Sequence, residues 1–254
     1  MTKKCGYQMM VEITQLIEEV IKITWKQLYY CARQANSAYA LKCGSAFQTK
    51  KKPELLKHLD ASKNLLKSVP ITISKFTNMK QLILNQNAIT EIPEEIGLCK
   101  NLVQLELSEN LLIDLPMNIK MLEKLTTIVL SKNAFQAYPI ALCLLQHLDV
   151  ANLSDNQITE LPADIGNSSC IEINLDNNKL EKLNDNIANC KRLKVLRLNH
   201  NCLTVEVFTK QLMENSPVCK IYFEGNYFEE KQFQQLPGYN QYEQRYTANV
   251  NKVN

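Results

Sequence analysis

The feature that most constrains this chain is an asparagine that recurs at a nearly constant interval of 22, 23 or 25 residues. The eight positions are Asn64, Asn87, Asn110, Asn133, Asn156, Asn178, Asn201 and Asn226. Each lies three residues after one apolar position, which is Ala61 at the first site, and two residues before another. The pattern L-x-x-L-x-L-x-x-N-x-L therefore occurs eight times between residues 53 and 228. A period of this length is typical of a solenoid, in which each repeat packs against its neighbours.

Each part of the repeat has a mechanical interpretation. The L-x-L core alternates with period two, which predicts a short strand with one buried face. Strands of successive repeats then lie side by side in a parallel sheet. The asparagine turns the chain out of the strand, and its amide can bond the backbone groups that the turn leaves unpaired. We therefore interpret the asparagines as structural rather than catalytic.

The return segment is also periodic. A proline ends the turn in five repeats: Pro70, Pro93, Pro116, Pro139 and Pro162; Asn184 takes its place in the sixth. Apolar positions three and six residues later predict a short helix or 3-10 turn with a buried inner side. The predicted fold class is α/β: a curved solenoid with a parallel sheet on the concave face and short helices or 3-10 turns on the convex face.

Three regions follow from this reading. Residues 1–52 hold nine Lys/Arg and three Asp/Glu, a net charge of +6, and apolar residues over 10–30 predict one amphipathic helix. That helix either caps the first repeat or forms an extension with its own partner. Tyr39–Leu41 resembles a decayed strand. Residues 53–228 are the eight repeats, and residues 229–254 are a C-terminal cap and tail. Aromatic residues from Tyr227 to Tyr246 are predicted to cover the last repeat.

Charge and cysteine usage bound the function. The overall charge is +3, so residues 53–254 carry −3, which predicts no nucleic-acid partner. The chain has nine cysteines, an odd number, and no Cys-x-x-Cys pair. This pattern argues against a disulfide framework and against a zinc site. Cys99, Cys170 and Cys190 fall in apolar columns and are predicted to be buried. With no signal-peptide core or membrane span expected, we predict a cytoplasmic protein, with membrane association as the alternative.

The repeat motif, continued by L-x-x-L-P-x-x-I, resembles that of the typical 23-residue intracellular leucine-rich-repeat family. Four stretches resemble one subfamily more closely, within a likeness that spans residues 55–248: 148–158, 194–203, 224–229 and 238–248. The resemblance implies a protein-binding role. Members of the subfamily are expected to begin Met-Gly, an N-myristoylation acceptor. This chain begins Met1-Thr2-Lys3, so that anchor is not carried over.

The candidate site lies on the concave face, where two columns flank the central strand residue. The first column is His58, Gln81, Gln104, Thr127, Val150, Glu172, Val195 and Lys220; the second is Asp60, Ile83, Glu106, Val129, Asn152, Asn174, Arg197 and Tyr222. Apolar and charged members of these columns form the predicted protein-binding set: Ile83, Glu106, Val129, Val150, Glu172, Val195, Arg197, Lys220 and Tyr222. Interface hot spots favour Tyr and Arg, so the neighbourhood of Arg197 and Tyr222 is the preferred contact patch.

Three classes of function compete. The favoured one is a non-catalytic scaffold or adaptor in intracellular signalling, monomeric, with protein partners. A lipid-anchored or peripheral membrane adaptor is the alternative. An enzyme is disfavoured, because His58, His147 and His200 lie in different repeats and no phosphate loop or His-Glu-x-x-His motif occurs. We expect no catalytic residue, cofactor or metal.

Overall fold

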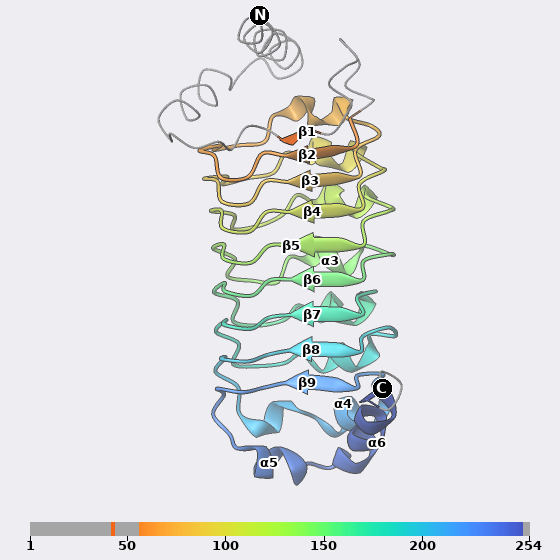
Figure 1. Ribbon diagram of the computed structural model, residues 1–254. Helices are drawn as coiled ribbons and strands as arrows, with labels where there is room; N and C mark the ends of the chain where they lie inside the picture. Colours follow the sequence, from red (N-terminus) through yellow and green to blue (C-terminus); the bar gives the residue numbers. More distant parts are fainter. Residues whose placement is uncertain (1–41, 44–55, 251–254) are drawn as a thin grey trace, which may run out of the picture.

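A computed structural model describes residues 42–43 and 56–250, which form one open sheet of nine strands in sequence order (Figure 1). Eight parallel strands of three residues each make up most of it: β2 (His58–Asp60), β3 (Gln81–Ile83), β4 (Gln104–Glu106), β5 (Thr127–Val129), β6 (Val150–Asn152), β7 (Glu172–Asn174), β8 (Val195–Arg197) and β9 (Lys220–Tyr222). They coincide with the predicted strands. A two-residue strand, β1 (Lys42–Cys43), pairs antiparallel with β2.

Two N-terminal predictions lie outside the described residues: the helix over 10–30 and the strand over 39–41. Strand β1 begins one residue after the latter.

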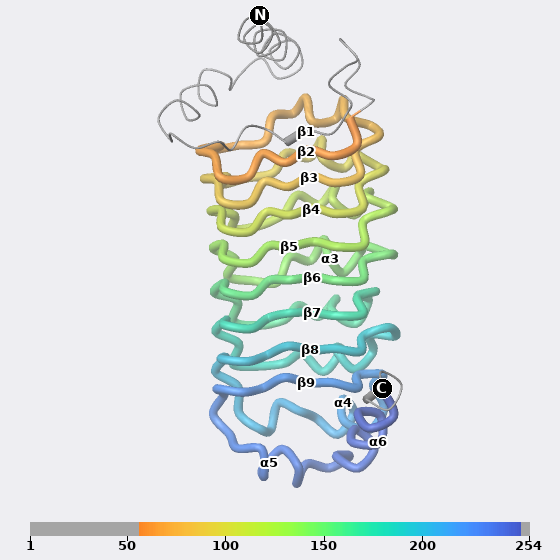
Figure 2. The backbone as a smooth tube through the Cα atoms, viewed as in Figure 1, coloured from red at the N-terminus to blue at the C-terminus, as the bar shows by residue number. Residues whose placement is uncertain are grey.

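Short 3-10 turns and helices follow the strands and lie on the side of the solenoid opposite the sheet (Figure 2). They are η3 (Ile71–Lys75), η4 (Glu94–Leu98), η5 (Met117–Met121), α3 (Ile140–Cys143), η6 (Ala163–Asn167), η7 (Asp185–Asn189), η8 (Val205–Val207) and α4 (Lys210–Asn215). Five begin directly after a proline of the predicted column, whose ring presets the φ angle at the start of a helix. The asparagine that replaces the sixth proline, Asn184, caps η7 by accepting a bond from the backbone N–H of Asn186 at 3.1 Å. The predicted leucine-rich-repeat architecture is confirmed.

The core is a single stack of apolar side chains between the sheet and the turns. In β3 to β9 the middle residue is buried and the two flanking residues are half-buried, as period-two alternation requires. The strands pair without slip, so Leu82 lies opposite Leu105 and Leu105 opposite Ile128. Adjacent turns also approach closely. A Cβ on Gly97 would lie 2.5 Å from the carbonyl oxygen of Asn118 in the next turn, so glycine suits this contact.

The recurrent asparagine joins each repeat to the one before it. The side-chain Nδ2 of Asn156 donates to the carbonyls of Leu130, Leu153 and Ser154 at 3.0–3.1 Å. Its Oδ1 accepts a bond from the backbone N–H of Phe135 at 3.2 Å. Leu130 and Phe135 belong to the preceding repeat, so one buried side chain satisfies backbone groups of two repeats.

The residue before each asparagine has a positive φ angle. The seven non-glycine examples are Lys63, Gln86, Glu109, Lys132, Asp155, Asn177 and His200, with φ between 53° and 58°; Gly225 takes the eighth position with φ +74°. This left-handed column was not among the predictions. A positive φ angle is unfavourable for most residues other than glycine, so backbone hydrogen bonds must hold this conformation in place. The N–H of Lys132, for example, donates to the Ser154 carbonyl at 3.0 Å.

The C-terminal end is closed by α5 (Glu230–Gln234) and α6 (Tyr239–Val250). Phe233 contacts Phe208 and Phe223 with ring centroids 5.2 and 4.4 Å apart, and the Tyr242 hydroxyl accepts a bond from the N–H of Ile221 in β9. Arg245 of α6 donates to the carbonyls of Met213, Glu214 and Val218. The last repeat is thus covered by aromatic packing and by backbone bonds.

Part of the aromatic prediction was wrong. Tyr227 is 71% exposed and is not buried in the cap, whereas the ring of Tyr246 stacks on that of Tyr242 with centroids 6.4 Å apart. Tyr227 occupies the outward position between the asparagine and the next apolar residue of the repeat, which explains why its side chain points to solvent.

The asparagine column can be tested by replacing Asn156 with alanine. The change removes four hydrogen bonds and leaves buried backbone groups unpaired, so we expect unfolding to become easier by roughly 3 kcal/mol or more. Urea denaturation of the full chain measures this. The matched control is Gln157→Ala at the exposed neighbouring position, where we expect a change within about 0.5 kcal/mol. Equal effects of the two substitutions would contradict the structural role of the column.

Candidate functional site

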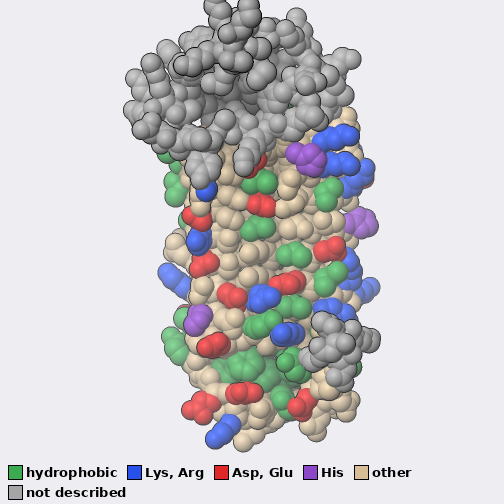
Figure 3. Space-filling view, in the orientation of Figure 1, with side chains coloured by type: hydrophobic (Ala, Val, Ile, Leu, Met, Phe, Trp, Pro, Cys, Tyr) green, Lys and Arg blue, Asp and Glu red, His purple; other side chains and the backbone are tan. Residues whose placement is uncertain are grey.

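The two columns that flank the buried strand residues form one continuous surface, which we term the open face of the sheet. It consists of the first and third residues of each three-residue strand from β2 to β9. Hydrophobic and charged side chains are interspersed along it (Figure 3). The backbone of this surface is held by the sheet and the asparagine column, so its side chains are not needed to close the core.

All nine predicted binding residues lie on the open face, and each is half-buried. The structure brings four of them together on β7, β8 and β9, and we call this group the Arg197 cluster: Glu172, Arg197, Lys220 and Tyr222. The other five continue the same columns: Ile83, Glu106 and Val129 are register neighbours, and Val150 and Val195 both lie opposite Glu172. Ile83 and Glu106 lie on β3 and β4, Val129 and Val150 on β5 and β6, and Val195 on β8.

Arg197 is the centre of its cluster. Its Nε donates to Glu172 Oε1 at 2.6 Å, and its guanidinium carbon lies 4.4 Å from the centroid of the Tyr222 ring. Lys220 Nζ lies 4.7 Å from the same centroid. The bond to Glu172 raises the pKa of Arg197, and a side-chain bond to Tyr222 raises the pKa of Lys220. Both groups therefore stay cationic, and the ring is fixed against two cations.

A second polar group lies on β3 and β4, which the sequence analysis did not single out. Gln81 Nε2 donates to Gln104 Oε1 at 2.9 Å, and the Gln104 amide donates to Glu106. Asn85 Nδ2 donates to the other carboxylate oxygen of Glu106 at 2.7 Å. The amides hold the carboxylate at a defined position on the open face. The two glutamines in one column beside a glutamate were the signal that could have indicated this network.

The three described histidines do not share a site. His58, His147 and His200 are all exposed and lie in separate repeats. Within the same described part of the chain, no group of three or more His, Cys, Asp or Glu could hold a metal ion. Nor does any helix described there have the length and apolar character that a membrane crossing requires.

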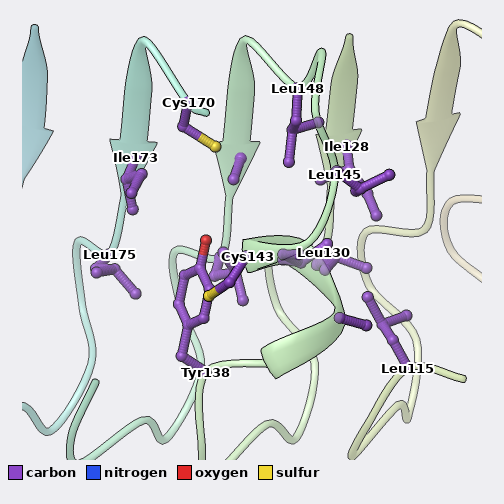
Figure 4. Packing of buried hydrophobic residues seen from close by; sticks show 14 of the residues in the cluster. Leu115, Ile128, Leu130, Tyr138, Cys143, Leu145, Leu148, Cys170, Ile173 and Leu175 are labelled. Carbon is purple, nitrogen blue, oxygen red and sulfur yellow. The ribbon is translucent and has the colours of Figure 1, made fainter. Parts of the chain in front are cut away.

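Five cysteines of the repeats are buried in the core, and Cys202 is half-buried. Figure 4 shows Cys143 beside the ring of Tyr138, with Cys170 nearby. Burial raises the pKa of Cys99 and Cys170 to about 11 and of Cys143 and Cys190 to about 12. The predicted burial of Cys99, Cys170 and Cys190 is confirmed. Thiols in this protonation state are poor nucleophiles.

Structural comparisons support the leucine-rich-repeat fold. The chain is similar to internalin C2 from Listeria monocytogenes, with a TM-score of 0.59 and 21% identity over 73% of this chain and 79% of that one. It is also similar to the leucine-rich-repeat ectodomain of the membrane receptor kinase GASSHO1/SCHENGEN3 from Arabidopsis thaliana, with a TM-score of 0.55 and 29% identity over 67% of this chain.

A Leptospira interrogans leucine-rich-repeat protein matches with 26% identity over 71% of this chain and a TM-score of 0.47. This chain spans 57% of the Leptospira protein and 21% of the plant ectodomain. No family model matches the chain. The fold is that of leucine-rich-repeat proteins.

Thiol labelling tests the buried cysteines. In native protein at pH 8, we expect iodoacetamide to leave Cys99, Cys143, Cys170 and Cys190 unmodified, because their raised pKa values keep almost all of each thiol protonated and the core excludes the reagent. Half-buried Cys202 should react before the five buried cysteines of the repeats. Peptide mass spectrometry reads each site, with urea-denatured protein as the control. Rapid native labelling of Cys143 or Cys190 would remove these residues from the core.

Proposed function

We propose that the protein is a non-catalytic interaction scaffold or adaptor in intracellular signalling, and that it binds protein partners through the open face of the sheet. The observation that carries this proposal is the Arg197 cluster. It presents an arginine, a tyrosine and a lysine, all partly exposed, on a rigid backbone at one end of the open face. Arg and Tyr dominate many interface hot spots, and side chains held in place before binding lose less entropy when a partner docks.

The comparisons give this proposal further support. Leucine-rich-repeat folds commonly mediate protein–protein interaction. The plant ectodomain that this chain resembles was solved in complex with CASPARIAN STRIP INTEGRITY FACTOR 2. We also propose a closer kinship with leucine-rich repeat-containing protein 57, supported by the sequence of residues 148–158, 194–203, 224–229 and 238–248. That kinship favours protein binding but identifies no partner.

The function is tested by the double variant Arg197→Ala with Tyr222→Ala. Both side chains are half-exposed, and their ion pair and ring contact contribute little, so we expect the free energy of unfolding to fall by no more than about 1 kcal/mol. Loss of two hot spots worth about 2 kcal/mol each should remove at least one partner from affinity capture in cells.

The matched control places the same kind of change on the turn side, as Lys120→Ala with Met121→Ala. These residues are exposed on η5, and we expect their loss to leave the set of captured partners unchanged. If the Arg197–Tyr222 variant melts normally and captures the same proteins as wild type, the binding surface lies elsewhere.

We propose a peripheral membrane adaptor as a second candidate, since one observation favours it. Residues 56–80, the described part of the first repeat and the start of the second, hold five lysines and one carboxylate, Asp60, a net charge of +4. The lysines, all exposed, are Lys57, Lys63, Lys67, Lys75 and Lys80. Leu65 and Ile71 in this repeat are 60% and 63% exposed. Cationic side chains beside exposed apolar ones suit an anionic lipid surface.

Vesicle sedimentation tests this second candidate. We expect the full chain to bind vesicles of phosphatidylcholine with phosphatidylserine but not phosphatidylcholine alone, and Lys63→Glu with Lys67→Glu to weaken binding by about tenfold or more. The control, Lys179→Glu with Lys182→Glu, makes the same charge change at exposed positions far along the solenoid. Equal binding by the two variants would refute a lipid-binding first repeat.

A further inference from the structure

The charges on the open face are ordered along the solenoid. Asp60 on β2 and Glu106 on β4 are acidic, and Lys220 on β9 is basic. Strands β5 and β6 carry no charge on this face, since their outward residues are Thr127, Val129, Val150 and Asn152, and β7 and β8 carry Glu172 and Arg197. One end of the open face is therefore negative, the centre is uncharged and partly apolar, and the other end is positive.

Internal pairing sharpens this order. Glu172 and Arg197 neutralise each other through their 2.6 Å ion pair. Asp60 is engaged locally, since its Oδ1 accepts bonds from the N–H and the hydroxyl of Ser62.

Three charges on the open face have no opposite charge beside them in the described part of the chain: Asp60, Glu106 and Lys220. Glu106 accepts only amide protons, from Asn85 and Gln104. Lys220 lies against the Tyr222 ring rather than a carboxylate. Glu106 adjoins the uncharged centre, whereas Asp60 lies two strands further out, so Glu106 and Lys220 are the charges that a partner lying across β4 to β9 can pair.

The dimensions of the open face select the form of the partner. Glu106 and Lys220 are five strand steps apart, which at about 4.8 Å per step is about 24 Å along the sheet. An extended chain covers that length in about seven residues at about 3.3 Å each. The two columns are two residues apart within a strand, about 7 Å between Cα atoms, so the face is a strip two side chains wide. A single extended segment matches such a strip.

We propose that the open face binds an extended segment of a partner protein that crosses strands β4 to β9, with a Lys or Arg against Glu106, an Asp or Glu against Lys220, and uncharged or apolar residues over Val129 and Val150. This inference rests on the proposed function and gives the partner its chemistry. The end charges select the orientation and identity of the segment, because a like charge at either end is repelled, while the apolar centre and the Arg197 cluster supply most of the affinity.

Selection from a random peptide display library on the immobilised full chain tests the proposal. We expect wild-type protein to enrich peptides that carry one basic and one acidic residue separated by about six uncharged residues. Glu106→Lys should instead enrich peptides with acidic residues at both ends, and Lys220→Glu peptides with basic residues at both ends. The double variant Glu106→Lys with Lys220→Glu should again select one charge of each sign.

Two further measurements complete the test. The charge-reversal control is Lys120→Glu with Glu123→Lys, at exposed positions on the turn side, and it should select the wild-type pattern. Fluorescence polarisation with a peptide selected on wild type should show about tenfold weaker binding to each single open-face variant. A peptide selected on that variant should restore the affinity, and added salt should reduce the difference between the two peptides.

The outcomes separate this inference from the proposed function. If wild type selects no peptide, or if all variants select the same peptides, the charge-ordered segment is refuted. If partner capture still depends on Arg197 and Tyr222 in that case, the open face remains the binding surface and only the chemistry assigned to its partner falls.

Discussion

The asparagine amide that spans two repeats is the interaction on which the rest of the structure depends. A parallel strand of three residues that turns sharply leaves buried backbone groups with no partner in its own repeat. Asn156 supplies partners to three carbonyls and one N–H, and Asn178 and Asn201 repeat the arrangement. Because each amide reaches back to the preceding repeat, the sheet cannot slip, and the spacing of the outward side chains follows from it.

This division of labour frees the open face. The leucines fill the core, the asparagines satisfy the turns and the prolines start the return segments, so the outward strand residues are under no comparable demand. Surface changes away from such structural features shift stability by only about 0.5 kcal/mol. Chemistry on the open face can therefore vary without loss of the fold, which is why binding is best sought there and why the buried thiols are not candidates.

Much of this architecture could be predicted because it is periodic. The strands, the prolines and the two outward columns each have a residue type that recurs in register. The left-handed column is mixed: Asp155, Asn177, His200 and Gly225 are residue types that adopt a positive φ more readily, but Lys63, Gln86, Glu109 and Lys132 are not. The conformation there is imposed by bonds to the next repeat, which a local reading of residue types does not contain. The Tyr227 error has a related cause, since an aromatic residue was assigned to the cap although its repeat position is outward.

The Arg197 cluster could be predicted only in part from the two columns of outward residues. Register alone places Arg197 opposite Tyr222, and the parallel sheet confirms that pairing. Register does not show that Glu172 takes up the charge of Arg197, because that bond joins different columns on adjacent strands and depends on the rotamers of two long side chains. Once that pair is neutral, Lys220 becomes the cation that a partner can pair, and its counterpart is a glutamate held by amides five strands away. The fold thus sets the positions of the charges, and side-chain pairing sets which of them remain for binding.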